Sequence, residues 1–370
     1  MERTGQSGIK LRLHLGPEKT GTSFLQCLSV ANRGLLAERG IHFPTGTPHD
    51  ERCMRDGRIS AGNGRILARL VEDEDWQAVQ GWIACAVEAC SQNACSELLI
   101  SSEQLLAPLA GPGLLGHFLK SVRSAGISEI SLLLILRDPV SQLLSLYKHR
   151  AKGGSAGRIG DWVESGYLLP NHLGELRRQL EPTDVELCVR AYSREPGGLA
   201  RLFFRDWLEL GEKIDGAAAE VNPSLSLSEL ELLRLLHARR PELVPFFYEA
   251  LLVVPRADKV QGRALEDHAR AVAENAVWQH REEWQRWNAL LPEGEALSLP
   301  ERPPDIPAYP AELGFSEQQL ECLAEFLSEA ASFRFLLRLI WRSRIRPGLG
   351  RIARAVGVRG FRVRGSGFRG

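Results

Sequence analysis

The sequence has no long apolar run and no paired cysteines. No stretch approaches the ~18 consecutive apolar residues of a membrane-spanning helix, so we expect nothing in this chain to cross a bilayer. The seven cysteines form no CxxC pair and have no histidine partner at zinc-finger spacing, so we expect no metal site of that kind. An odd number of cysteines and the lack of a recognisable signal peptide favour a reducing cytoplasm.

Acidic residues are missing from one end of the chain. From Arg334 to Gly370 there are 11 arginines and no Asp or Glu, although the formal net charge of all 370 residues is zero. The first 333 residues therefore carry a compensating charge of about −11. Such a tail suits peripheral contact with an acidic glycan or membrane surface, or a disordered solubilising end; we favour disorder beyond Gly348. We expect no nucleic-acid partner.

The periodicity divides the chain into three parts. Short apolar runs alternate with helical patterns over residues 1–222, which predicts a central parallel sheet flanked by helices. The strand signal then disappears, and residues 223–343 are predicted as a helical extension with a Pro-rich connector at 292–310. Residues 344–370 form the basic, flexible tail.

The expected elements follow from these patterns. Alternating or continuous apolar runs predict strands at Ile9–Leu15, Gly40–Pro44, Glu97–Ser101, Ile130–Leu136 and Val185–Val189. Helical spacing predicts helices over 65–94, 111–126, 140–150 (starting at Pro139), 199–210, 226–239, 263–291 and 316–341. Residues 45–64 show little periodicity and are predicted as a long loop. Three cysteines spaced by five, Cys85, Cys90 and Cys95, are predicted to be buried on one helix.

The first predicted strand leads into a small polar turn, GPEKTGTS, followed by a helix. Lys19, Thr20, Gly21, Thr22 and Ser23 put a cation, hydroxyls and a glycine at the helix start, where free N–H groups and the helix dipole favour an anion. An ordinary strand-to-helix turn would also fit. The Walker spacing G-x-x-x-x-G-K-[ST] is absent, because the lysine precedes the second glycine.

Three charged residues follow three predicted strands. Lys19 comes after the first strand, Glu103 after Glu97–Ser101, and Arg137 after Ile130–Leu136. The carboxyl ends of parallel strands share one edge of a sheet, so we expect these side chains to meet there. Ser145, eight residues after Arg137 in RDPVSQLLSLY, is placed to add a hydroxyl to a second anion site. Taken alone, Arg137 would more simply pair with Asp138 or with a nearby helix end, and Ser145 would be a neutral helix residue.

Together, GPEKTGTS and LRDPVSQLLSLYKH resemble the two signature elements of the PAPS-dependent sulfotransferases, and the similarity extends over about residues 10–229. VRAYSRE and VNPSLSLSE also look like stretches of bacterial members. The resemblance implies a P-loop-like three-layer α/β fold. It also implies a cofactor, 3′-phosphoadenylyl sulfate (PAPS), released as adenosine 3′,5′-bisphosphate (PAP), and no required metal.

Roles for individual residues are also implied by the resemblance. Lys19 to Ser23 would hold the 5′-phosphosulfate, with Lys19 stabilising the leaving phosphate; Arg137 and Ser145 would hold the 3′-phosphate; and Tyr192 would contact the adenine, although plain packing fits Tyr192 equally well. The acceptor would be a hydroxyl, with a mild preference for a glycan or glycolipid, bound by residues 45–64, 153–160 and the helical extension.

A base and two rival functions stay open at this level. Glu103 is the preferred base over His14, His42 and His49, and an exposed helix-capping role for it is the less favoured alternative. Lys148, His149 and Arg150 either extend the basic rim or form a solvated face. The rivals are a nucleotide-dependent kinase, with Asp138 as a metal-binding carboxylate, and a non-catalytic sulfotransferase-like binding protein.

Overall fold

Five parallel strands form the centre of the computed structural model, which describes residues 8–211, 214, 225–254 and 262–330. The strands are β1 (Ile9–His14), β2 (Ile41–His42), β3 (Glu97–Ser101), β4 (Ile127–Leu136) and β5 (Glu186–Ala191). Their order across the sheet is β2-β3-β1-β4-β5, and all four neighbouring pairs run parallel. The expected parallel sheet is therefore confirmed, and β1 lies at its centre.

Helices cover both faces of this sheet in three layers. Those of residues 1–211 are α1 (Thr22–Ala31), α2 (Arg33–Glu38), α3 (Pro48–Arg55), α4 (Arg65–Glu72), α5 (Trp76–Gln92), α6 (Leu106–Leu109), α7 (Leu114–Ser124), α8 (Pro139–Ala151), α9 (Ile159–Gly166), α10 (Leu169–Leu180), α11 (Gly198–Ala200) and a π-helix at Arg201–Trp207. Alternate residues of β4 enter opposite cores: Leu132 and Leu134 pack with α4, α5 and α7, and Leu133 with α1 and the π-helix. Every residue of β4 from Ile130 onward is buried, because both faces are covered.

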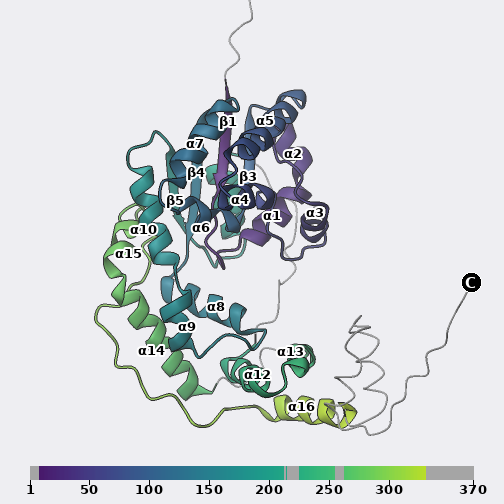
Figure 1. Cartoon of the computed structure of the whole chain (residues 1–370), viewed down its shortest axis with the longest axis vertical. Helices are drawn as coiled ribbons and strands as arrows, with labels where there is room; N and C mark the ends of the chain where they lie inside the picture. The colour runs from purple at the N-terminus through teal and green to yellow at the C-terminus, as the bar shows by residue number, and fades with distance from the viewer. Residues whose placement is uncertain (1–7, 212–213, 215–224, 255–261, 331–370) are drawn as a thin grey trace, which may run out of the picture.

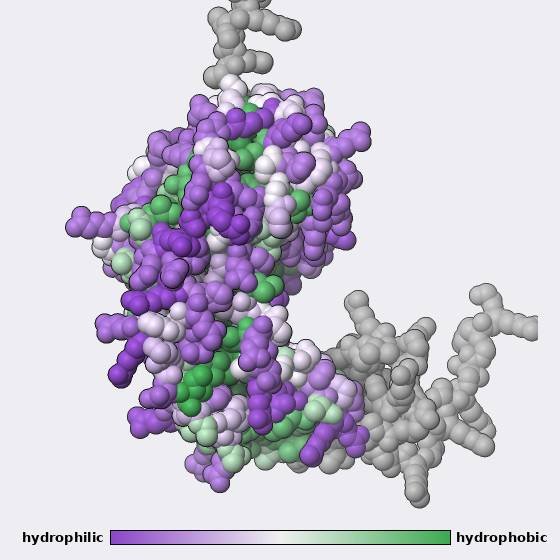
Figure 2. Space-filling view, turned by 60° about the vertical axis from the view of Figure 1, so that its left-hand side comes forward, coloured by the Kyte–Doolittle hydropathy of each residue, from purple (hydrophilic) through white to green (hydrophobic). Residues whose placement is uncertain are grey.

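The described remainder of the chain contains helices and a long connector between the last two of them, and no strand. It contains α12 (Leu227–Arg239), α13 (Val244–Leu252), α14 (Arg263–Gln279), α15 (Arg281–Asn288) and α16 (Glu317–Ala330). Figure 1 shows that α12, α13, α14 and α16 lie with α8 and α9 in a lower part of the molecule, below the sheet. In the space-filling view the molecule narrows between the two parts, and apolar surface gathers below this waist (Figure 2).

The capping chemistry of α12 matches its sequence. Ser226 Oγ accepts from Glu229 N at 3.2 Å, and the Glu229 carboxylate accepts from Ser226 N at 2.6 Å. This reciprocal pair satisfies two N–H groups that the first turn would otherwise leave free. The predicted start of this helix is therefore confirmed.

Several predicted elements differ in detail. The 65–94 helix breaks between α4 and α5, where Glu74 adopts φ +53°, and the 263–291 helix breaks at His280. The 45–64 loop contains α3, begun by Thr47, whose hydroxyl accepts from Asp50 N. Cys95 is buried but lies beyond the end of α5, and Cys85 is exposed, so Cys90 alone of the three cysteines is buried on that helix.

Two residues on the polar face of β1, Arg12 and His14, are buried as well, and Lys10 on the same face is half-buried. Arg12 is 5% exposed; its Nε donates to Glu97 at 2.6 Å and its guanidinium to Trp207 O at 3.1 Å. His14 is fully buried, with Nδ1 2.9 Å from Ser101 Oγ. Residues of β3 and the π-helix provide partners for Arg12 and for His14 Nδ1, whereas His14 Nε2 is buried without a partner in the described structure.

Some expectations fall outside the described residues. The boundary at 222, part of VNPSLSLSE, the end of the 316–341 helix and the whole basic tail lie there. Within the described chain, no helix has the length and apolar character needed to cross a membrane.

Candidate functional site

Four neighbouring strand ends bring charged and aromatic residues to one edge of the sheet. Lys19 lies five residues after β1, Glu103 two residues after β3, and Arg137 immediately after β4. Tyr192 follows β5 directly, and its N–H donates to Leu136 O at 2.7 Å. Because β3, β1, β4 and β5 are successive neighbours, the alignment expected from the sequence is present.

The backbone of the turn after β1 is fixed by hydrogen bonds from Arg137, which precedes α8, and from Gln142 on α8. Arg137 Nη1 donates to Lys19 O at 3.2 Å, and Gln142 Nε2 donates to Glu18 O at 3.0 Å. Thr20 Oγ1 donates to Pro17 O at 2.7 Å within the turn. Strand ends far apart in sequence thereby fix the backbone of this turn.

Two glycines allow the turn to pack as tightly as it does. A Cβ on Gly16 would lie 2.0 Å from Thr22 Oγ1. Gly21 adopts φ +84°, and its Cβ would lie 2.3 Å from Leu199 Cδ2 and 3.4 Å from the Tyr192 ring. A side chain at Gly16 would have to displace Thr22, and one at Gly21 would be strained by the positive φ and would have to displace Leu199.

The N-terminus of α1 is open to an anion. Gly21 precedes it without a side-chain cap, and its first turn contains no acidic residue. Thr22 Oγ1 is buried and has no hydrogen-bond partner in the described structure. Free backbone N–H groups, an unpartnered hydroxyl and the nearby Lys19 are a set of donors that a phosphate or sulfate group can satisfy.

One face of α8 is directed at the turn. Gln142, Ser145, His149 and Lys152 are spaced by three, four and three residues, so they share one side of the helix. Gln142 bonds the turn, and both His149 and Lys152 interact electrostatically with Lys19. Ser145 lies between them, half-buried, and its hydroxyl makes no hydrogen bond within the described residues.

Burial changes the titration of three residues here. Desolvation raises the Glu103 pKa to about 7, with Glu18 adding repulsion and Lys19 opposing the rise. It lowers the pKa of His149 to about 4, assisted by Lys19, Lys152 and Arg150. Burial also lowers the pKa of Lys19, helped by the positive charge of Lys152. At neutral pH, Glu103 is therefore divided between its two forms and His149 is neutral, so His149 does not extend a basic rim.

Unsatisfied polar atoms gather at this edge. Ten buried side-chain N or O atoms lack a partner in the described structure, and four of them belong to Thr22, Arg137, Gln142 and His149. A buried polar atom without a hydrogen bond costs about 1–3 kcal/mol, and such atoms are uncommon in folded proteins. Their concentration around one turn points to a ligand that would satisfy them.

Arg137 and Tyr192 define the side of the turn nearest β5. The guanidinium carbon of Arg137 lies 5.5 Å from the centre of the Tyr192 ring, while Arg137 Nε is among the unpartnered atoms. Burial and the neighbouring Arg194 lower the Arg137 pKa. Arg137 is a second cation at this edge, and its charge contributes to lowering the pKa of Lys19, so negative charge here would interact with both.

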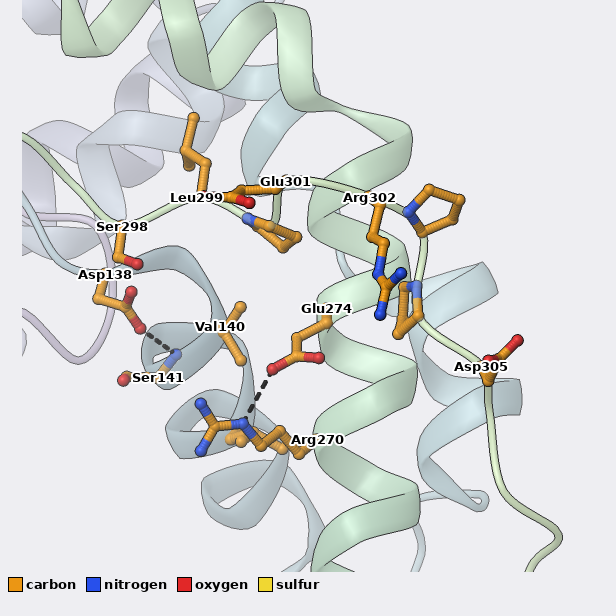
Figure 3. A pocket seen from close by; sticks show the side chains of 14 residues that line it. Asp138, Val140, Ser141, Arg270, Glu274, Ser298, Leu299, Glu301, Arg302 and Asp305 are labelled. Carbon is orange, nitrogen blue, oxygen red and sulfur yellow. Dashed lines mark hydrogen bonds and ion pairs between the residues drawn. The ribbon is translucent and has the colours of Figure 1, made fainter.

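A polar groove of about 750 Å³ begins beside these residues, between the start of α8, α14 and the connector (Figure 3). Asp138 accepts from Ser141 N at 2.8 Å, and Arg194 donates to Ser141 Oγ at 3.2 Å. The groove's other wall is formed by Arg270, Glu274 and residues 298–305. The helical extension therefore lines it, whereas residues 45–64 and 153–160 do not.

Sequence reasoning missed Gln142 and Lys152. Counting three back and seven forward from Ser145 would have placed both on its helix face. The described residues contain no group of three or more His, Cys, Asp or Glu side chains arranged to hold a metal ion. No family model, curated protein or solved structure matches this chain.

Proposed function

We propose that the chain is a sulfotransferase that moves a sulfuryl group from PAPS to an acceptor hydroxyl. The observation that carries this proposal is the set of buried, unpartnered polar atoms of Thr22, Arg137, Gln142 and His149 around the turn after β1, together with two cations, Lys19 and Arg137. A nucleotide with phosphate at both 5′ and 3′ positions supplies negative charge to both cations, and the sequence resemblance favours the same donor.

The proposed donor contacts follow from position. The N-terminus of α1, with Thr20, Gly21, Thr22 and Ser23, would hold the 5′-phosphosulfate beside Lys19. Arg137 and the free hydroxyl of Ser145 would bind the 3′-phosphate. Tyr192 lies against Arg137 and Gly21, where an adenine would meet its ring.

The proposed reaction needs a base on the acceptor side. The acceptor oxygen attacks sulfur, its proton passes to Glu103, and the bond from sulfur to the bridging oxygen breaks as PAP leaves. Lys19 stabilises the negative charge on the departing phosphate oxygen. A carboxylate with a pKa of about 7 suits proton removal near neutral pH, because enough of it is ionised and it is still basic.

The kinase alternative is weakened by Asp138. Its carboxylate caps α8 through Ser141 N instead of standing free to hold a metal ion. The non-catalytic alternative predicts the same nucleotide contacts without transfer. Radiolabelled sulfate transfer from PAPS to a panel of glycans, phenols and lipids separates it from the enzyme.

Arg137→Ala tests the donor site directly. We expect at least a tenfold loss in PAP affinity, about 1.4 kcal/mol, because a buried charge-assisted contact is removed. Calorimetric titration measures the PAP affinity of both proteins. Arg178→Ala, which removes an exposed arginine on α10, is the control. Unchanged PAP affinity in Arg137→Ala would remove Arg137 from this role, and tighter binding of Mg-ATP than of PAP by the wild type would favour the kinase.

A further inference from the structure

The C-terminal half of α8 continues past the proposed donor contacts. Ser145, His149 and Lys152 share one face, and a helix rises about 1.5 Å per residue. Lys152 is therefore about 10 Å beyond Ser145 along the axis, on the side away from Arg137. A group held at Lys152 is not the phosphate held at Arg137.

Lys152 is a cation without a carboxylate partner in the described structure. Its two neighbours differ: Lys148 pairs with Glu266 at 3.5 Å, and Arg150 pairs with Glu18. Lys152 Nζ instead lies 5.9 Å from the centre of the Tyr248 ring. It also stands close enough to Lys19 for mutual repulsion, so an anion beside it would be stabilising.

His149 supplies a different kind of contact next to this cation. Its Nδ1 is buried and has no hydrogen-bond partner among the described residues. Burial lowers the pKa of His149, and the charges of Lys19, Lys152 and Arg150 lower it further, so the neutral ring keeps a nitrogen that can accept a hydrogen bond from a hydroxyl. A hydroxyl contact and an anion contact thus lie one turn apart on the same helix face.

We propose that His149 and Lys152 form the acceptor subsite and that the acceptor is an acidic glycan, with a carboxylate or ester sulfate at Lys152 and a nearby hydroxyl on His149 Nδ1. This rests on the proposed function, which places the 5′-phosphosulfate beside Lys19 and the 3′-phosphate at Arg137 and Ser145. It narrows the acceptor from any hydroxyl to one beside a fixed negative charge. Glu103, on the neighbouring strand end, is then the group that removes the acceptor proton.

The test uses the full chain saturated with PAP, and matched polysaccharides as probes. Chondroitin and alginate are compared with their carboxyl-reduced, uncharged counterparts by calorimetry at 0.15 M salt. We expect at least fivefold tighter binding of an acidic polymer, with Lys152→Met lowering that preference at least threefold and leaving PAP affinity unchanged. Lys148→Met removes the same charge one turn away and should keep the preference; the Arg-rich tail is identical in both variants.

Each outcome decides the subsite. Equal binding of acidic and neutral polymers, or equal effects of Lys152→Met and Lys148→Met, overturns it. Weaker PAP binding by Lys152→Met would assign this lysine to the donor instead and also overturns it. If wild-type protein does not bind PAP, the donor proposal fails by itself, and the contrast between the two variants without PAP still decides the acidic-glycan contact. His149→Asn, which keeps a polar atom near Nδ1, should bind better than His149→Leu.

Discussion

At the scale of single residues, burial gives Glu103 and His149 opposite chemistry. Both are desolvated, and desolvation disfavours the charged form of each. For Glu103 this raises the pKa into the neutral range, while for His149 it lowers the pKa to about 4. The carboxyl is therefore the group that changes protonation near pH 7, and the imidazole stays a neutral hydrogen-bonding group.

The raised pKa of Glu103 can be tested with the variant Glu103→Gln, whose stability relative to wild type should depend on pH. The folded-state pKa of Glu103 is about 7 and the unfolded value is near 4.5, so the folded state binds more protons between these pH values. Stability from this group is then lost as pH rises through that window. We expect the melting temperature of Glu103→Gln, relative to wild type, to be about 2–5 °C higher at pH 8 than at pH 5.

Differential scanning fluorimetry at pH 5 and pH 8 measures the melting temperatures of wild type and Glu103→Gln. Glu164→Gln, on the exposed side of α9, is the control. An offset that does not change with pH would show that Glu103 titrates normally.

At the scale of elements, the turn after β1 and the start of α8 act as one unit. Arg137 and Gln142 hold two consecutive carbonyls of the turn, so the position of α8 sets the shape of the turn. Leu199, just after the N-terminus of α11, closes the turn over Gly21. Side chains from three segments that are distant in sequence therefore contact this one turn.

Gly21→Ala should disrupt this unit. Its φ of +84° and the 2.3 Å approach to Leu199 predict a loss of about 1–3 kcal/mol in the free energy of unfolding, together with weaker PAP binding. Gly34→Ala in α2 meets no atom within 4 Å and should be neutral or stabilising by up to about 1 kcal/mol. Urea unfolding compares the two. Equal effects would mean that the turn yields to a side chain at little cost.

The sequence predicted the strand ends well because each strand is a local pattern. Lys19, Glu103 and Arg137 could be placed at one edge from chain order alone, since alternating strands and helices imply parallel pairing. The rotation of α8 about its own axis could not, because packing against α12 and α14 sets it. Gln142 and Lys152 did not depend on that rotation, since helical spacing from Ser145 alone places both on the same face. The break at Glu74 was missed because no glycine or proline marks it.

At the scale of the whole molecule, one hydrophobic core joins the sheet to the later helices. The same cluster contains Leu13 of β1, Leu143 of α8, Leu233 of α12 and Trp284 of α15. Arg177 on α10 also donates to Glu283 on α15 at 3.1 Å. The helices after residue 225 therefore complete the packing of α8 and α10.

A fragment of residues 1–222 should fail to fold on its own. Removing the later helices would expose apolar surface of α8 and α10, because α12 and α14 pack against α8 and α15 packs against α10. We expect no cooperative thermal transition and no PAP binding, measured by circular dichroism and calorimetry. A fragment that melts cooperatively and binds PAP would instead establish residues 1–222 as an independent domain.

At Lys19, the backbone conformation favours glycine for stability, whereas the proposed function needs the lysine side chain. It adopts φ +70°, a conformation that glycine accepts freely and that lysine adopts only under constraint from its surroundings. The same backbone twist offers its carbonyl to Arg137 and leaves its ammonium partly buried. Selection of this protein for thermal stability should therefore replace Lys19 by glycine. The resulting protein would resist heat better and lose the cation at the centre of the site.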